Sequence, residues 1–250
     1  MVDRQELTLI AAFSLIIIIS YGVSNLIQSH RVIETRIYYD ESNTAPSINT
    51  YSVILDENFE STITGSLPWG WEHSGDPQDQ ANVVYNSENS WTKSLYLHEE
   101  GGDSQNSKVK ISHLNGRNIL LDFYYMINGS SADRQVFQFF NEEGLQCVGM
   151  NTLINYSWRY RSPSIGTIGG GVWTDIPELG VVENGKQYHI QIYADYELQS
   201  VVYGVDGVYS DWLPSLRPWS TITAISFRGN LNYPSDAWYD NFSIIEYTRE

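Results

Sequence analysis

Cysteine is almost absent from this 250-residue chain, which holds a single one, Cys147. One cysteine cannot form an intramolecular disulfide, so the folded part has to rely on its own hydrophobic core. Cys147 lies within the strand-like run 145–150. We therefore interpret it as a small buried hydrophobic residue rather than as a nucleophile.

Positive charge is also scarce. The chain has 14 Lys and Arg residues against 30 Asp and Glu residues, which gives a net charge of −16 at pH 7. Lysine occurs only at positions 93, 108, 110 and 186, and no basic stripe is visible in the sequence. A polyanion would be repelled by this balance, so nucleic acid is not an expected partner. The excess of acidic residues is compatible with cation binding.

Residue patterns typical of catalysis are missing as well. Retaining glycosidases carry two carboxylates about 5 Å apart, but the acidic pairs 99–100 and 142–143 lie beside glycines in predicted turns, and 175–178 contains a proline. The five histidines are isolated and lack the spacing of zinc ligands. The glycines at 169–171 are not followed by the Lys-Ser/Thr of a phosphate loop. The sequence therefore does not predict an enzyme.

One long apolar segment stands out against these absences, because no charged residue occurs between Leu7 and Ile27. A helix of about 21 residues would span roughly 31 Å, close to the thickness of the hydrocarbon core of a bilayer. We expect a single N-terminal transmembrane helix, with residues 1–28 as membrane anchor and residues 29–51 as stalk and linker. A cleaved signal peptide and a pilin-like assembly helix are the alternatives.

The orientation of this anchor is not decided by charge, since positive residues on its two sides are nearly balanced. Three N-x-S/T sequons favour an external domain, and they begin at Asn128, Asn155 and Asn241. We expect a single-pass protein bound to the membrane through its N-terminal helix, with the C-terminal domain outside the cytoplasm.

Residues 52–250 have the pattern of a β domain. Apolar residues alternate in 119–127 and again in 188–195, as in half-buried strands. Asn-Gly pairs at 115–116, 128–129 and 184–185 and an Asp-Gly pair at 206–207 are typical of tight hairpins. Many short strands with close turns predict an all-β, two-sheet antiparallel β-sandwich, or jelly roll.

Several segments of this domain match a known family in order and spacing. They are DENFE at 56–60, LPWGW at 67–71, SLYL at 94–97, YHIQI at 188–192 with VVYGVDG at 201–207, and WYDNFSI at 238–244. With them, residues 53–247 resemble the concanavalin A-like lectin/glucanase superfamily, in its laminin-G-like and carbohydrate-binding-module-like branches. The resemblance implies a jelly roll whose last strand pairs with its first, and it names a fold rather than a ligand.

The resemblance also implies a structural Ca²⁺ between the first and last strands. The matching oxygen donors are Glu60 and Asp240, with Asp56 or Glu57 and main-chain carbonyls completing the shell. Strict alternation would place Asp240 on the inner face with Trp238. An inward carboxylate has to find a cation or hydrogen-bond donors.

Aromatic residues supply the candidate ligand platform. Six of the eight tryptophans lie near predicted turns or in irregular stretches, while Trp71 and Trp238 are expected in the core. We expect a sugar to stack on Trp158 and Tyr160 of one strand and on Trp173 of the following loop. The alternative is that these rings only cover the edges of the sandwich.

These observations favour a membrane-anchored, extracytoplasmic, non-catalytic binding module that recognises carbohydrate or a surface partner protein. A second hypothesis is a structural or assembly subunit of a surface filament or envelope layer, in which the apolar helix would pack against its copies. A glucanase-type glycoside hydrolase is the third, with carboxylates that meet only in the folded chain.

Overall fold

The computed structural model describes residues 45–75, 79–85, 93–99, 108–129, 133–163, 171–228 and 234–249. The expected anchor at 1–28, and the stalk as far as residue 44, lie outside these residues. Among the residues that are described, no helix is long and apolar enough to cross a membrane.

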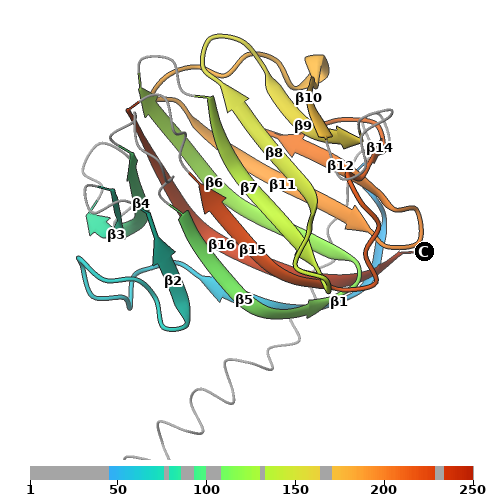
Figure 1. Cartoon of the computed structure of the whole chain (residues 1–250), viewed down its shortest axis with the longest axis horizontal. Helices are drawn as coiled ribbons and strands as arrows, with labels where there is room; N and C mark the ends of the chain where they lie inside the picture. The colour runs from blue at the N-terminus through green and yellow to red at the C-terminus, as the bar shows by residue number, and fades with distance from the viewer. Residues whose placement is uncertain are drawn as a thin grey trace, which may run out of the picture. The chain divides into compact units, whose positions relative to one another are not determined.

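The domain is a sandwich of two antiparallel sheets, as the alternation and the turns predict (Figure 1). In the described part of the chain one sheet has nine strands in the order β13-β12-β11-β6-β16-β4-β3, with β1 also paired to β16 and β14 to β12. The other has seven, in the order β10-β9-β8-β7-β15-β5-β2. The nine-stranded sheet consists of β1 (Ile48–Glu57), β3 (Gln80–Tyr85), β4 (Lys93–Glu99), β6 (Ile119–Gly129), β11 (Gln187–Asp195), β12 (Ser200–Val205), β13 (Val208–Tyr209), β14 (Leu213–Pro214) and β16 (Ser235–Arg249). The seven-stranded sheet consists of β2 (Trp71–Ser74), β5 (Lys108–Gly116), β7 (Asp133–Asn141), β8 (Gln146–Leu153), β9 (Trp158–Pro163), β10 (Gly171–Asp175) and β15 (Ile222–Arg228). A short 3-10 helix, η1 (Pro177–Leu179), follows β10.

The core between the sheets is largely aromatic. The apolar residues of β6 and β11 that the alternation places on one face are buried there. Phe227 of β15 lies at the centre, with ring centroids 4.8 Å from Tyr239, 5.1 Å from Phe242, 6.3 Å from Phe123 and 6.4 Å from Trp71. Aromatic pairs at these separations stabilise a core beyond the area that they bury. This cluster joins the seven-stranded sheet to the nine-stranded one.

The pairing of the first and last strands is confirmed. β1 runs antiparallel to β16 from Ile48, opposite Arg249, to Glu57, opposite Phe242. The strand begins four positions before the expected start of the domain at residue 52. Ala45 is already buried in a small apolar cluster with Tyr193 and Tyr247, so the predicted linker ends earlier than the sequence indicated.

The hairpin signals are partly right. Asp206 and Gly207 both have positive φ, 51° and 81°, and form the turn between β12 and β13 as predicted. Gly116, in contrast, is the last residue of β5, and the turn falls on Arg117 and Asn118.

The predicted face of Asp240 is wrong, and a β-bulge is the reason. Asn241 has φ of 46°, and the register of β16 against β6 shifts between Asp240 and Ser243. Tyr239 on one side of the bulge and Phe242 on the other both enter the core. Asp240, and Trp238 two residues before it, therefore leave the strand on the side away from the core.

We predict that Phe227→Ala lowers the free energy of unfolding by about 3–5 kcal/mol, because it leaves a cavity among four aromatic rings. Urea unfolding of the full chain in detergent measures this loss. Ile63→Ala is the control, since Ile63 is 76% exposed and its removal should change stability little. Equal losses in the two variants would contradict the assignment of the core.

Candidate carbohydrate-binding face

Two of the three predicted platform residues belong to the core. Trp158 is fully buried, with its ring edge-on to Tyr188 at 5.0 Å and to Tyr125 at 6.3 Å. Tyr160 is also buried, with its ring centroid 6.0 Å from that of Tyr203. An indole with no exposed surface cannot stack on a sugar, so Trp158 is not a ligand platform. The alternation Trp-Arg-Tyr-Arg in β9 is right, but the aromatic residues point inward.

Trp173 of β10 is placed differently. It pairs with Arg161 of β9, and the Arg161 guanidinium lies 5.1 Å from the centre of its ring. Trp173 is half-buried and is not part of the core. It is the one residue of the predicted platform that stays on the outer side of the seven-stranded sheet.

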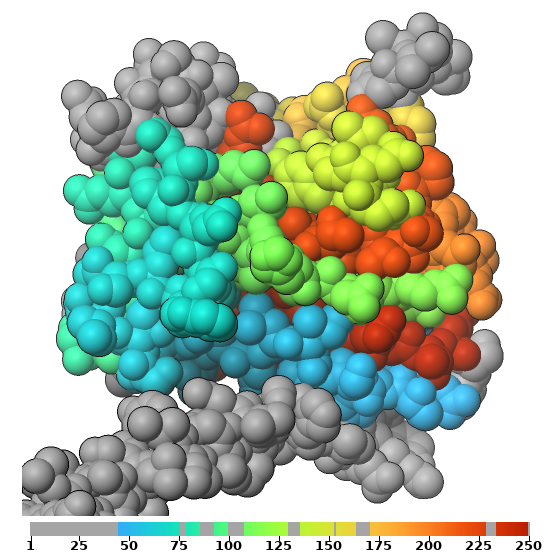
Figure 2. Space-filling model, turned by 60° about the horizontal axis from the view of Figure 1, so that its bottom comes forward, coloured from blue at the N-terminus to red at the C-terminus, as the bar shows by residue number. Residues whose placement is uncertain are grey.

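The register of the strands shows which residues of the neighbouring strands share this outer side. Val109 and Ile111 of β5 and Ile225 and Phe227 of β15 point into the core, so Lys108, Lys110, Ser226 and Arg228 point outward. Pairing then links Lys110 to Ser226, Ser226 to Gln138 of β7, and Gln138 to Gly149 of β8. Figure 2 shows the green atoms of β5, the orange-red atoms of β15 and the yellow-green atoms around β8 side by side on this surface. We call this surface the polar face, and define it by Lys108, Lys110, Gln138, Phe140, Gln146, Asn151, Arg159, Arg161, Trp173, Ser226 and Arg228.

The centre of the polar face is built from amides that are almost out of contact with solvent. Gln138 is 4% exposed, Asn151 3% and Ser226 0%, although all three lie outside the core. Gln138 Nε2 donates to Gln146 Oε1 at 3.1 Å, and Ser226 Oγ donates to Gln138 Oε1 at 3.4 Å. A Cβ at Gly149 would lie only 2.5 Å from Gln146 Nε2, so this glycine makes room for the Gln146 amide.

Some of these polar atoms have no partner within the described part of the chain. They are Asn151 Oδ1, Gln146 Nε2 and Arg161 Nε, all of them buried. Buried polar atoms in native proteins are nearly always hydrogen-bonded. Because such an atom also occurs in the core, at Trp158 Nε1, these atoms single out the polar face only together with its rings and charges.

Cations flank the amide centre on both sides. Burial, with the charges of Arg228 and Lys110, lowers the pKa of Lys108. Burial, with the charge of Arg217, likewise lowers the pKa of Arg161. This basic surface was not predicted, although Lys-Val-Lys at 108–110 and Arg-Tyr-Arg at 159–161 place each pair of charges on one side of a strand.

The predicted calcium ligands are only partly brought together. Asp240 is 5% exposed, and its Oδ1 lacks a hydrogen-bond partner among the described residues. Burial raises the pKa of Asp240 to about 6, and the nearby charge of Glu60 adds to this effect. Asp56 instead accepts a hydrogen bond from Ser243 Oγ at 3.0 Å. Within the described ranges no group of three His, Cys, Asp or Glu side chains is positioned to hold a metal ion.

A lysine lies beside Glu60, and the main-chain N–H of Lys93 donates to Glu60 Oε1 at 3.0 Å. Lys93 Nζ donates to the main-chain oxygens of Glu60 at 2.8 Å and of Thr62 at 3.0 Å. These carbonyls are thus already bound to a cation. The described side chains therefore bring together only two carboxylates, Asp240 and Glu60, whereas Ca²⁺ takes about six to eight oxygen ligands.

The outer side of the nine-stranded sheet carries two histidines, each paired with an aspartate. His189 Nε2 lies 2.8 Å from Asp122 Oδ1, and His98 Nδ1 lies 2.8 Å from Asp236 Oδ1. The ring of His189 stacks on Tyr124 at 4.9 Å, and the hydrogen bond to Asp122 raises the pKa of His189. Their hydrogen bonds are made within the protein, so we interpret both pairs as structural.

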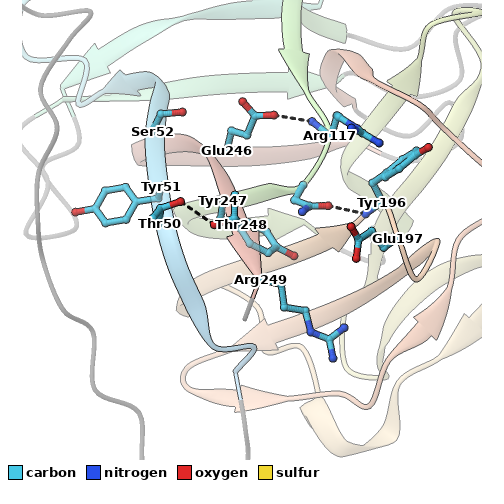
Figure 3. Close-up of a pocket in the computed structure, with 11 residues that line it drawn as sticks. Thr50, Tyr51, Ser52, Arg117, Tyr196, Glu197, Glu246, Tyr247, Thr248 and Arg249 are labelled. Carbon is cyan, nitrogen blue, oxygen red and sulfur yellow. Dashed lines mark hydrogen bonds between the residues drawn. The ribbon is translucent and has the colours of Figure 1, made fainter.

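A hollow of about 410 Å³ lies where the last strand ends, between β1 and the loops before β6 and β12 (Figure 3). Its polar groups bind one another: Thr50 Oγ1 lies 2.7 Å from Thr248 Oγ1, and Arg117 N donates to Glu246 Oε1 at 3.1 Å. The Arg117 guanidinium lies 4.0 Å above the ring of Tyr196. The polar groups that line the hollow therefore connect the ends of the strands. Among the described residues, fewer of them lack a hydrogen-bond partner than on the polar face.

Comparison with solved structures finds the same fold in proteins with little sequence similarity. One is a sialidase, with a TM-score of 0.62 and 13% identity over 76% of this chain, which spans only 18% of that protein. A second is an endo-β-1,4-glucuronan lyase from the fungus Trichoderma reesei, with a TM-score of 0.54 and 13% identity, matched over 79% of this chain and 95% of the lyase. A third, described with endo-acting O-glycanases of the human gut microbiota that initiate mucin breakdown, has a TM-score of 0.52 and 10% identity over 78% of this chain and 99% of its own.

These likenesses are consistent with the concanavalin A-like sandwich that the sequence motifs imply. At 10–13% identity they show the fold and nothing more. No family model and no curated protein sequence matches the chain.

The raised pKa of Asp240 gives a pH prediction. Because the folded state holds this proton more tightly than the unfolded chain, with a pKa of about 6 against 3.8, the stabilisation is present below about pH 4 and is lost as the pH rises through about 6. In chelator, the free energy of unfolding of the wild type should fall over this pH range by at most about 3 kcal/mol more than that of Asp240→Asn. Parallel pH profiles of the two proteins in urea unfolding would contradict the burial of this carboxyl.

Proposed function

We propose that the domain from residue 45 onward is a non-catalytic carbohydrate-binding module, displayed outside the cytoplasm by the N-terminal apolar segment. The observation that carries the proposal is the polar face, where amide side chains lie between a half-buried aromatic ring and cationic side chains. Sugar-binding sites combine apolar ring contacts with a few oriented polar groups in the same way. The fold is shared with a sialidase and a glucuronan lyase, whose names refer to carbohydrates.

Each part of the polar face has a role in this proposal. Trp173, half-buried and outside the core, offers ring surface to the C–H side of a sugar. The Phe140 ring is already in contact with a cation, since Lys108 Nζ lies 5.2 Å from its centre. Gln146 and Arg161, both partly exposed, supply the polar contacts to sugar hydroxyls. Glu72 and Asp175 lie on the two edge strands of the sheet, β2 and β10, which supports a binding rather than a hydrolytic role.

The calcium ion and the anchor belong to the same proposal. Glu60 and Asp240 would hold the ion as a structural one, on the other sheet from the ligand. The anchor rests on the uncharged run from Leu7 to Ile27. A partner glycan would lie on the same side of the membrane as the domain.

We predict that Trp173→Ala weakens glycan binding at least about tenfold, or 1.4 kcal/mol, because it removes the stacking surface. A glycan array screened with the full chain in detergent identifies a ligand, and titration calorimetry measures its affinity for each variant. Tyr85→Ala is the matched control, since Tyr85 is 69% exposed and lies on β3 of the other sheet. Cleavage of the glycan would contradict the non-catalytic role, and equal effects of the two variants would contradict the site.

Calcium at roughly millimolar concentration should raise the melting temperature of the wild type at pH 7, because it binds the folded form. The same addition should leave Asp240→Asn unchanged. Equal melting temperatures of the wild type in calcium and in chelator would remove calcium from the proposal without affecting the polar face.

A further inference from the structure

The cations of this acidic protein are gathered on one surface. Six of the 14 Lys and Arg residues lie on or beside the polar face, in a chain whose net charge is −16. Lys108, Lys110 and Arg228 form one group on β5 and β15. The second group consists of Arg159 and Arg161 on β9 together with Arg217, which donates to the main-chain oxygen of Gln146 at 2.7 Å.

The crowding of these charges is a cost to the folded chain. Burial, and after it the charge of neighbouring cations, lowers the pKa of both Lys108 and Arg161. Carboxylates could offset the repulsion, but they lie at the margins. Glu72 lies opposite Lys110 in the strand register at the β2 edge, and Asp175 lies opposite Arg159 at the β10 edge. The charge of Glu99, on β4 of the other sheet, acts on Arg228. The described residues at the centre of the face are neutral amides and Ser226.

The distance between the two cationic groups sets the size of the ligand. Lys110 and Arg161 are separated by the strands β15, β7 and β8. Four spacings of about 4.8 Å between neighbouring strands put their backbones roughly 19 Å apart. A single sugar ring cannot reach both groups, whereas an oligosaccharide lying across the strands can.

We propose that the ligand of the polar face is a polysaccharide that carries carboxylates on repeated sugars. The inference rests on the proposed carbohydrate-binding function and deepens it by naming the class of glycan. Carboxylates of two sugars bind the two cationic groups. The planar guanidinium of Arg161 can donate two parallel hydrogen bonds to one carboxylate, and the ammonium of Lys110 attracts the other as a single positive charge. The sugar between them lies on the amides of Gln138, Gln146 and Asn151.

The test compares matched charged and neutral polymers. Alginate, polygalacturonate and hyaluronate are titrated against the full chain in detergent, alongside the same polymers after reduction of their carboxyl groups to alcohols. We expect at least one carboxylated polymer to bind at least about 30-fold more tightly than its reduced form, and its affinity to fall as salt is added.

Two substitutions localise the effect. Lys110→Gln and Arg161→Gln should each weaken binding of the charged polymer about tenfold and leave binding of the reduced polymer nearly unchanged. Lys186→Gln removes the same charge at an exposed position, where Lys186 pairs with Glu183 at 2.8 Å, and should have no effect. Melting temperatures verify that each variant is folded.

Each outcome decides between the proposals. Equal affinity for charged and reduced polymers would overturn the inference and leave carbohydrate binding standing. Binding of neither form would overturn both proposals. An equal loss in Lys186→Gln, or comparable binding of double-stranded DNA, would show attraction to any polyanion and overturn the inference. Cleavage of the charged polymer would support the inference and overturn the non-catalytic role.

Discussion

The packing of the seven-stranded sheet against its partner sets the direction of the side chains that form the polar face. Successive residues of a strand point to opposite sides, so burial of Phe227 and Ile225 turns Ser226 and Arg228 outward. In β9, burial of Trp158 and Tyr160 likewise turns Arg159 and Arg161 outward. A shift of one residue in either strand would exchange the core for the polar face. The aromatic core and the candidate site are therefore two sides of a single register.

This dependence explains why the site tolerates unfavourable contacts. Like charges and unsatisfied amides on the polar face raise the free energy of the folded chain, as burial of Asp240 does on the other sheet. The aromatic cluster and the pairing of β1 with β16 stabilise the sandwich and offset this cost. Strain of this kind collects at functional surfaces because the rest of the structure can support it.

The fold could be predicted largely from the sequence because its signals are local. Alternation in 119–127 and 188–195, and the Asp-Gly turn at 206–207, correspond to β6, β11 and the β12–β13 hairpin. The β-bulge at Asn241 could not be read from alternation, because one additional residue reverses the face of all that follow. Likewise, alternation in β9 separates Trp158 from Arg159 but does not say which of them enters the core. Lys110 and Arg161 lie far apart in sequence and share a surface only through the order of the strands.

In our proposal a glycan binds on the outer side of the seven-stranded sheet. The most direct measurement is a crystal structure of the protein with an oligosaccharide taken from the polymer that binds most tightly. We expect sugar density across β15, β7, β8 and β9, in contact with Gln146 and Trp173. Sugar bound instead over Tyr124 and His189 of the nine-stranded sheet, or in the hollow beside Arg117, would contradict it.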